Sequence, residues 1–93
     1  MATSPSRRFT ETQGQYLAFI HAYTLVNGCP PAEADMQRFF GVTPPSVHSM
    51  IVELERRGLI TRVPRQARSI AVSVGDEELP RLRQTIKTTA ARY

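Results

Sequence analysis

The sequence predicts an α+β fold that is mainly helical, with three helices followed by a β-hairpin and a short extra C-terminal helix. Two observations carry this prediction. Apolar residues recur at three- and four-residue spacing behind a threonine and two prolines, and this segment ends at a glycine. Two runs of β-prone residues then flank an arginine-rich turn. A capped amphipathic helix that leads into a basic hairpin is typical of the winged helix-turn-helix.

The third helix, expected over about residues 44–57, is indicated by its cap, its apolar stripe and its stop. Thr43 can accept hydrogen bonds from amide groups of the first turn, and Pro44 and Pro45 stand where a missing N–H costs little. The apolar stripe consists of Val47, Met50, Ile51 and Leu54. Gly58 supplies the left-handed residue that commonly ends a helix. One face of this helix is therefore predicted to lie on the core, and the opposite face is small and polar.

Two helices are expected upstream. The first covers about residues 11–26, because Thr10 and Gln13 have the spacing of a capping box and apolar residues continue with helical period. It ends at Gly28, since glycine favours a left-handed exit. The second covers about residues 33–40 and directs Met36, Phe39 and Phe40 toward the core. A glycine-bearing turn then leads into the third helix, which completes the helix-turn-helix order.

The hairpin is predicted from β-prone runs at residues 59–63 and 69–74, which flank a basic loop at 64–68. The arginine-rich wing is expected to comprise residues 62–69. From residue 76 onward three acidic residues can start a further helix, and Pro80 is tolerated in its first turn. The thin apolar stripe of this helix is Leu79, Leu82 and Ile86. We expect the helix either to pack back on the domain or to form a homodimer with a second copy, and we favour the dimer.

These elements define one domain with two flanking segments. Residues 1–9 are expected to be a flexible basic arm or a frayed end, residues 10–75 the winged helix-turn-helix domain, and residues 76–93 a C-terminal helix or tail. Cys29 stands alone, which argues against a disulfide framework and a zinc cluster, and we expect it to be buried or half-buried. No apolar run is long enough to cross a bilayer, so we expect a soluble, cytoplasmic protein.

The charge of the chain indicates a polyanionic partner. The formal net charge is +4, and basic surfaces attract phosphates and release their counterions. The positive charge is concentrated in a run of arginines with no acidic residue between them: Arg56, Arg57, Arg62, Arg65 and Arg68. The planar fork of arginine suits phosphate and guanine acceptors better than a point charge does.

Catalysis is not expected. No group of Cys, His and carboxylate residues has metal-ligand spacing, no glycine-rich phosphate loop is present, and the two histidines have no partnered nucleophile at a motif spacing. The sequence therefore predicts neither an enzyme nor a cofactor, and no small-molecule ligand is evident.

Several motifs between residues 10 and 72 carry a resemblance to a known family. They are Thr10-x-x-Gln13, Gly28-Cys29-Pro30-Pro31, Phe39-Phe40-Gly41-Val42, Glu53-Leu54-x-Arg56-Arg57-Gly58-Leu59-Ile60 and Arg68-Ser69-Ile70. With these motifs the chain resembles the N-terminal DNA-binding domain of LexA-type repressors. The resemblance implies a transcriptional regulator with a winged helix-turn-helix. The start of the third helix is also similar to that of DtxR-type and MarR-type regulators.

Two departures from the LexA pattern limit what the resemblance implies. LexA-type proteins carry a second domain with a serine-lysine self-cleavage pair, and the sequence after Val74 is too short to hold it, so we expect neither self-cleavage nor damage-triggered inactivation. One residue fewer precedes the recognition helix, and His48 and Ser49 stand where the family often has acidic residues. The resemblance therefore does not imply the family's SOS-box operator.

We predict that the third helix enters the major groove of double-stranded DNA. Thr43, Ser46 and free amide groups at its N-terminus are expected to bind a phosphate. The residues expected to face base edges are Pro45, His48, Ser49 and Val52, although His48 and Val52 can also be ordinary exposed residues. The arginines expected to contact the backbone or minor groove are Arg56, Arg62, Arg65 and Arg68. The alternative is a winged helix that serves as a protein-interaction or dimerisation module without specific DNA binding.

Overall fold

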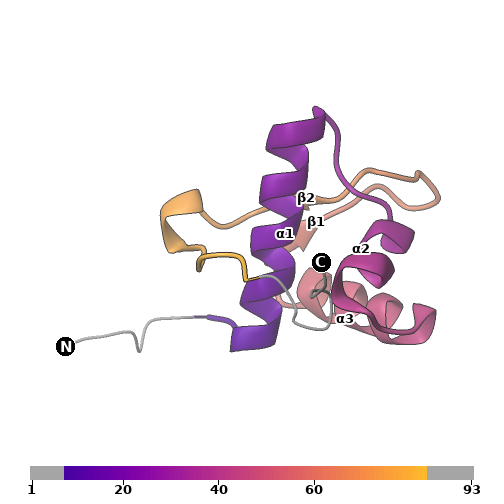
Figure 1. Ribbon diagram of the computed structural model, residues 1–93, viewed down its shortest axis with the longest axis horizontal. Coiled ribbons are helices and arrows are strands. Elements are labelled where there is room, and N and C mark those ends of the chain that lie inside the picture. The colour runs from indigo at the N-terminus through magenta and orange to yellow at the C-terminus, as the bar shows by residue number, and fades with distance from the viewer. Residues whose placement is uncertain (1–7, 84–93) are drawn as a thin grey trace, which may run out of the picture.

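The computed structural model describes residues 8–83, and its elements follow the predicted order (Figure 1). They are α1 (Glu11–Asn27), α2 (Glu33–Phe40), α3 (Pro44–Arg56), β1 (Ile60–Thr61), β2 (Ala71–Val72) and the 3-10 helix η2 (Asp76–Glu78). In Figure 1, α1 stands in the middle of the molecule, with α2 and α3 on one side and η2 on the other. The predicted winged helix-turn-helix of mainly helical α+β class is confirmed.

The central helix α1 is buried on all sides between residues 13 and 20. The Thr10 side-chain oxygen accepts the Gln13 N–H at 3.1 Å, and Gln13 Oε1 accepts the Thr10 N–H at 2.9 Å, which is the predicted capping box. Every residue from 13 to 20 is buried, because α2, α3, the hairpin and the C-terminal segment enclose the helix. Gly28, with a φ of 76°, then ends α1 in the left-handed conformation.

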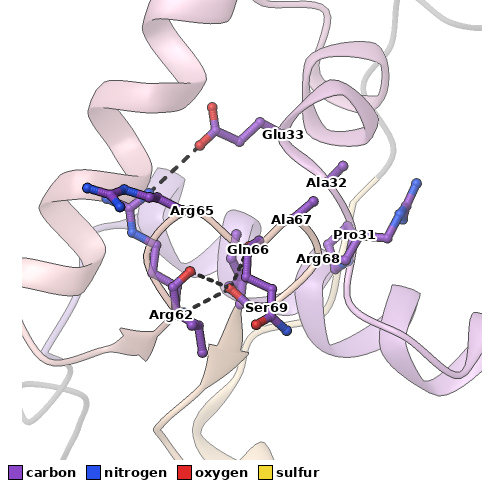
Figure 2. Close-up of a pocket in the computed structure, with 11 residues that line it drawn as sticks. Pro31, Ala32, Glu33, Arg62, Arg65, Gln66, Ala67, Arg68 and Ser69 are labelled. Carbon is purple, nitrogen blue, oxygen red and sulfur yellow. Dashed lines mark hydrogen bonds and ion pairs between the residues drawn. The ribbon is translucent and has the colours of Figure 1, made fainter.

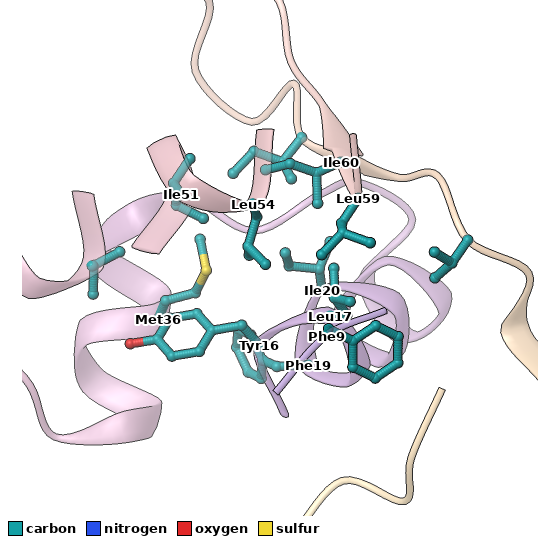
Figure 3. Close-up of a cluster of buried hydrophobic side chains, with 13 residues drawn as sticks. Phe9, Tyr16, Leu17, Phe19, Ile20, Met36, Ile51, Leu54, Leu59 and Ile60 are labelled. Carbon is teal, nitrogen blue, oxygen red and sulfur yellow. The ribbon is translucent and has the colours of Figure 1, made fainter. Parts of the chain in front are cut away.

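The apolar core lies between α1, α3 and the hairpin (Figure 3). The buried side chains are Phe9, Tyr16, Leu17, Phe19, Ile20, Met36, Val47, Ile51, Leu54, Leu59, Ile60, Ile70 and Val74. Of the predicted α3 stripe, Val47, Ile51 and Leu54 are fully buried, and Met50 packs at the edge. From α2, Met36 is fully buried, and the half-buried rings of Phe39 and Phe40 stack on Phe19 and Tyr16 with centroid distances of 4.6 and 4.2 Å. This core fixes the orientation of α3, because rotation of the helix would expose the large apolar side chains of its inward face to water.

The hairpin is shorter than the β-prone runs predicted. β1 and β2 pair antiparallel, with Ile60 opposite Val72 and Thr61 opposite Ala71. Beyond these pairs the Ser73 N–H donates to the Leu59 carbonyl at 2.9 Å, but no further residue is part of a strand. The loop that follows β1 contains left-handed residues at Arg65 and Arg68, with φ of 65° and 56°. The wing is therefore a long loop on a very short ladder.

The C-terminal segment differs from the predicted helix. A helix does begin at Asp76, but it is the single 3-10 turn η2, and Leu79 is already extended with φ −79° and ψ 141°. Pro80 explains the stop, because the residue before a proline is disfavoured in the α region. Leu79 and Leu82 then pack against the core of their own chain instead of forming a helical stripe. Ile86, with the rest of the predicted helix and its expected dimer contact, lies outside the described residues.

The N-terminal boundary is also earlier than predicted. Phe9, which we assigned to the flexible arm, is a core residue with only 6% of its surface exposed. Arg8 lies 3.6 Å from a carboxylate oxygen of Glu78. Residues 1–7 of the predicted arm lie outside the described residues. The ordered domain thus includes at least residue 9, and its packed C-terminal segment extends past the predicted boundary at residue 75.

Candidate nucleic-acid interface

The face of α3 opposite the core is open to solvent. Its residues are Pro45, Ser46, His48, Ser49, Val52 and Arg56, all of them exposed. Val52 leaves 43% of its surface in water, although it is a large apolar residue. The exposure follows the helical period, because the fully buried residues occupy the other side of the same helix. The structure thus brings the residues predicted on this helix together on one accessible face.

The first turn of α3 has no unengaged amide group among residues 44–47. Pro44 and Pro45 lack an N–H group. The Ser46 N–H is bonded to Thr43 Oγ1 at 3.3 Å and to the Thr43 carbonyl at 3.1 Å, and the Val47 N–H is bonded to the same carbonyl at 3.2 Å. The expected free amides are therefore absent from these residues. The solvent-facing groups here are the Thr43 and Ser46 hydroxyls, which are linked at 2.9 Å, at the positive end of the helix dipole.

Both arginines at the C-terminal end of α3 are paired with one carboxylate. Glu53 accepts hydrogen bonds from Arg56 Nε at 3.1 Å, from Arg56 Nη2 at 2.6 Å and from Arg57 Nε at 2.8 Å. These bonds, first from Arg56 and then from Arg57, lower the pKa of Glu53 from 4.5 to about 2. Glu53 therefore carries its full negative charge at neutral pH and offsets part of the positive field at this end of the helix.

A second set of charges links α2, α3 and the hairpin through Glu33. One carboxylate oxygen of Glu33 lies 3.5 Å from His48 Nδ1 and 4.0 Å from Arg62 Nη1. Arg62 Nε also donates to Glu55 Oε1 at 2.9 Å. Arg62 is consequently half-buried between two carboxylates rather than extended into solvent.

The wing arginines point in different directions (Figure 2). Arg62 and Arg65 lie on the same side of the loop as Glu33, along a cleft of about 300 Å³ between the wing and the start of α2. Within residues 8–83, Arg65 is exposed and has no recorded ion pair. Arg68 points to the other side of the loop, where its Nη1 donates to Tyr23, to Pro30 and to Asp35.

The sequence argument missed four acidic residues that shape this surface: Glu33, Asp35, Glu53 and Glu55. The spacing of Glu53 to Arg56 and Arg57, at three and four residues along a helix, was a signal that could have revealed one cluster. Asp35 and Glu33 meet the wing arginines across about thirty residues of chain, and no local pattern reports such contacts. The arginine run is basic along the sequence, but in space it is interleaved with carboxylates.

The sequence that forms α3 and the arginine-bearing wing matches a known family. The sequence matches the LexA DNA binding domain over residues 6–69, which span α1, α2, α3, β1 and most of the wing loop. The chain belongs to the LexA DNA-binding domain family. The predicted family resemblance is thereby confirmed.

Individual LexA proteins agree with this assignment. The chain is 36% identical over 73 residues to a LexA repressor of Thermosipho melanesiensis, which covers 78% of this chain and 37% of that protein. It is also 36% identical over 66 residues to a LexA repressor of Thermosipho africanus, covering 71% of this chain and 33% of that protein. A LexA repressor of Magnetococcus marinus is 31% identical over 68 residues, covering 73% and 29%. The alignments thus span about a third of the length of these LexA relatives.

The remaining findings concern a membrane span, a metal site and the single cysteine. Among residues 8–83 of this LexA-family domain, no helix is long and apolar enough to cross a membrane. In the same part of the chain, no group of three or more His, Cys, Asp or Glu side chains is placed to hold a metal ion. Cys29, expected to be buried or half-buried, is exposed in the turn that follows α1.

Proposed function

We propose that this domain is a sequence-specific, double-stranded DNA-binding transcriptional regulator that acts as a repressor. The observation that carries the proposal is the exposed face of α3, which stands opposite a fully buried stripe in a chain of the LexA DNA-binding domain family. The major groove, about 12 Å wide, admits an α-helix with such a face. The relatives named LexA repressor support the direction of regulation.

In this proposal four residues of α3 face the base edges: Pro45, His48, Ser49 and Val52. The Ser49 hydroxyl can donate or accept a hydrogen bond, and Val52 can contact a thymine methyl group. Both side chains are exposed, so no rearrangement of the helix is required. Direct readout of sequence is assigned to these residues.

Contacts with the phosphates are assigned to both ends of α3 and to the wing. Thr43 and Ser46 offer hydroxyls at the positive end of the helix dipole. Arg56 and Arg62 would exchange their carboxylate partners for DNA, whereas Arg65 has no ion pair to exchange within the described part of the chain. Arg65 is therefore the arginine best prepared to contact the backbone or minor groove.

The proposal is tested by selecting bound duplexes from a random DNA library at near-physiological salt and sequencing them. An enriched inverted repeat supports a sequence-specific regulator that binds as a homodimer, because two-fold protein symmetry demands a two-fold site. An enriched single site supports the same function with a monomer. A folded chain that enriches no sequence overturns specific DNA binding.

A second function is favoured by one observation. Among the arginines of α3 and the wing, four have a carboxylate partner in the same chain: Arg56, Arg57, Arg62 and Arg68. Such pairing leaves a more neutral surface, as suits a winged helix used for protein interaction. Under this alternative, duplex binding would disappear above low salt and show no sequence preference.

A further inference from the structure

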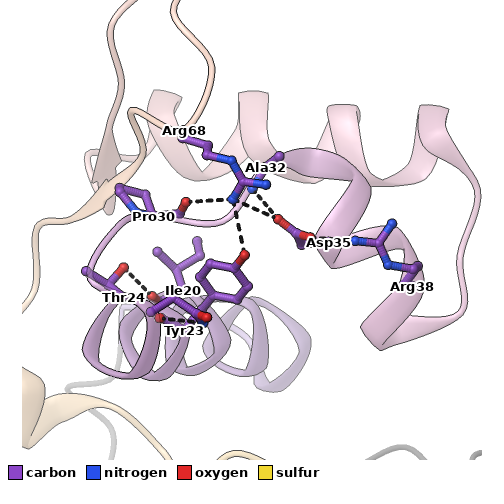
Figure 4. Close-up of polar contacts among 9 residues, drawn as sticks. Ile20, Tyr23, Thr24, Pro30, Ala32, Asp35, Arg38 and Arg68 are labelled. Atoms are coloured by element: carbon purple, nitrogen blue, oxygen red, sulfur yellow. Dashed lines mark hydrogen bonds and ion pairs between the residues drawn. The ribbon is translucent and has the colours of Figure 1, made fainter.

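Arg68 joins the wing to the turn between α1 and α2 (Figure 4). Its Nη1 lies 3.1 Å from the Tyr23 hydroxyl, 3.2 Å from the Pro30 carbonyl oxygen and 3.1 Å from Asp35 Oδ2. The guanidinium carbon also lies 6.0 Å from the centroid of the Tyr23 ring. One side chain of the loop thus reaches acceptors on α1, on the following turn and on α2.

The receiving end of this contact is built into the start of α2. Asp35 Oδ2 accepts a hydrogen bond from the Ala32 N–H at 2.8 Å, which caps the N-terminus of α2. The other carboxylate oxygen accepts a hydrogen bond from Arg38 Nη2 at 2.6 Å. The Asp35 side chain is only 10% exposed. The Ala32 amide, followed by the charges of Arg68 and Arg38, lowers the pKa of Asp35 and keeps it ionised at neutral pH.

Apart from Arg68, the wing is attached to the body of the domain by a short β-ladder and, at its base, by Arg62, which pairs with Glu55 of α3 and Glu33 of α2. The β-ladder contains only two residue pairs, at Ile60 and Thr61. Inside the loop, Ser69 Oγ accepts the Val63 N–H at 2.9 Å and lies 2.9 Å from the Gln66 carbonyl oxygen, which shapes the loop without attaching it to the helices. Arg68 has a left-handed φ of 56°, which few non-glycine residues adopt.

We propose that Arg68 is a positioning residue that holds the wing against the α1–α2 turn through Tyr23, Pro30 and Asp35, and that it does not act as a phosphate contact. The inference rests on the proposed DNA-binding function and refines it. It changes the role we predicted for Arg68 from the sequence, where it was grouped with the DNA-contacting arginines. Arg65, on the other side of the loop, keeps that role.

The two roles of Arg68 make different predictions for salt dependence. A residue that neutralises one phosphate changes the slope of log K against log salt by about 0.9 when it is removed. A residue that only positions the wing lowers affinity without changing this slope, since the number of released counterions stays the same. Arg65→Ala provides the matched control because both residues are exposed arginines of the same loop.

The experiment uses the full chain and the duplex that it enriches in selection. Amide hydrogen exchange of residues 62–69 is measured by NMR without DNA, relative to the core amides of α1 as an internal reference for global stability. We expect Arg68→Ala and Tyr23→Phe to accelerate amide exchange in the wing about tenfold, because the loop opens locally more often when contacts of Arg68 are removed. Arg38→Ala, which removes only the exposed Arg38–Asp35 pair, should leave wing exchange unchanged.

Duplex binding is then measured across a salt series. We expect Arg68→Ala to raise Kd about tenfold with an unchanged slope, as for a loop that must now be ordered on binding, whereas Arg65→Ala flattens the slope by about 0.9. Wing exchange at the wild-type rate in Arg68→Ala, or a slope that flattens as in Arg65→Ala, overturns the inference. If the wild-type chain enriches no duplex, the proposed function fails by itself, and the exchange rates alone decide whether Arg68 holds the wing.

Discussion

The carboxylate of Glu53 offsets part of the positive charge at the C-terminal end of α3. Its pKa is lowered from 4.5 to about 2 by hydrogen bonds from Arg56 and Arg57. The folded-state pKa lies below the unfolded value, so the contribution of Glu53 to stability is fully present above pH 4.5 and is lost as pH falls toward 2. Because the group is exposed, salt screens this contribution.

We therefore expect Glu53→Gln to lower the thermal midpoint at pH 7, and this effect should become much smaller as pH falls to 2. The measurement is thermal unfolding of wild type and variant from pH 2 to pH 7 at low ionic strength, with one series repeated in 0.5 M salt, where the difference should shrink. A difference between the two proteins that is constant over the whole pH range would show that the charge of Glu53 is not the cause.

The outward side chains of α3 lead to a different kind of prediction. Ser49→Ala and Val52→Ala should each change preference at particular base pairs of the selected duplex, by about 1–3 kcal/mol for a good contact. The measurement is Kd for the duplex and for its single-base variants. Thr12→Ala, an exposed change at the start of α1, is the control and should change no base preference. Equal losses on all duplexes would assign Ser49 and Val52 to stability rather than readout.

The contacts that could be predicted from the sequence are those between residues close together in the chain. The capping box of Thr10 and Gln13 was predictable because both partners lie within one helical turn. The exposure of Val52 followed from helical period. The partners of Arg68 did not, because Tyr23 and Asp35 are separated from it by 45 and 33 positions. Contacts across such distances depend on how the elements pack, which residue spacing does not report.

Among the elements, the C-terminal segment is an extended chain that is held in place by a buried polar side chain of α1. Gln15 of α1 is 9% exposed, and its Nε2 donates to the Arg81 carbonyl at 2.9 Å while its Oε1 accepts the Arg83 N–H at 2.8 Å. These two hydrogen bonds hold the extended chain against α1. Pro80 packs beside Gly14, where an added Cβ would lie 3.0 Å from the proline ring.

We expect Gln15→Ala to detach this segment from α1. Two backbone groups would lose their partners beside a buried helix, so the free energy of unfolding should fall by about 1–3 kcal/mol. Urea denaturation measures the fall, and limited proteolysis should cut the variant first near residues 79–83. Thr12→Ala on the exposed side of α1 should keep the wild-type midpoint. A Gln15→Ala midpoint equal to that of this control would contradict the assigned role.

Helices were predictable as elements, whereas the C-terminal segment was not. α2 has the predicted bounds, and α1 and α3 end within about one residue of theirs, because glycines, caps and periodic apolar residues act within each helix. The segment after Asp76 has acidic residues and spaced leucines that fit a helix equally well. Leu79 and Leu82 instead pack against the apolar core, which exists only after the domain has folded.

For the whole molecule, the distribution of charge matters more than its sum. The net charge of +4 indicates attraction to a polyanion, yet Glu33, Glu53 and Glu55 lie among the arginines that we propose to contact DNA. Ion pairs within the protein compete with phosphates for the same guanidinium groups. These carboxylates should therefore weaken non-specific binding, which depends on phosphate contacts alone, more than binding that base contacts also support.

The final prediction tests this competition by changing Glu33, Glu53 and Glu55 to glutamine together. We expect tighter binding to a duplex of unselected sequence, a steeper salt dependence and a smaller ratio of specific to non-specific affinity. The control changes Asp76 and the neighbouring Glu77 and Glu78 to their amides, which raises the net charge equally at η2, on the opposite side of α1 from α3 (Figure 1). Screening over about 10 Å at 0.1 M salt should make this control much less effective. Equal gains in both variants would mean that total charge, rather than the pairing of particular arginines, governs association with DNA.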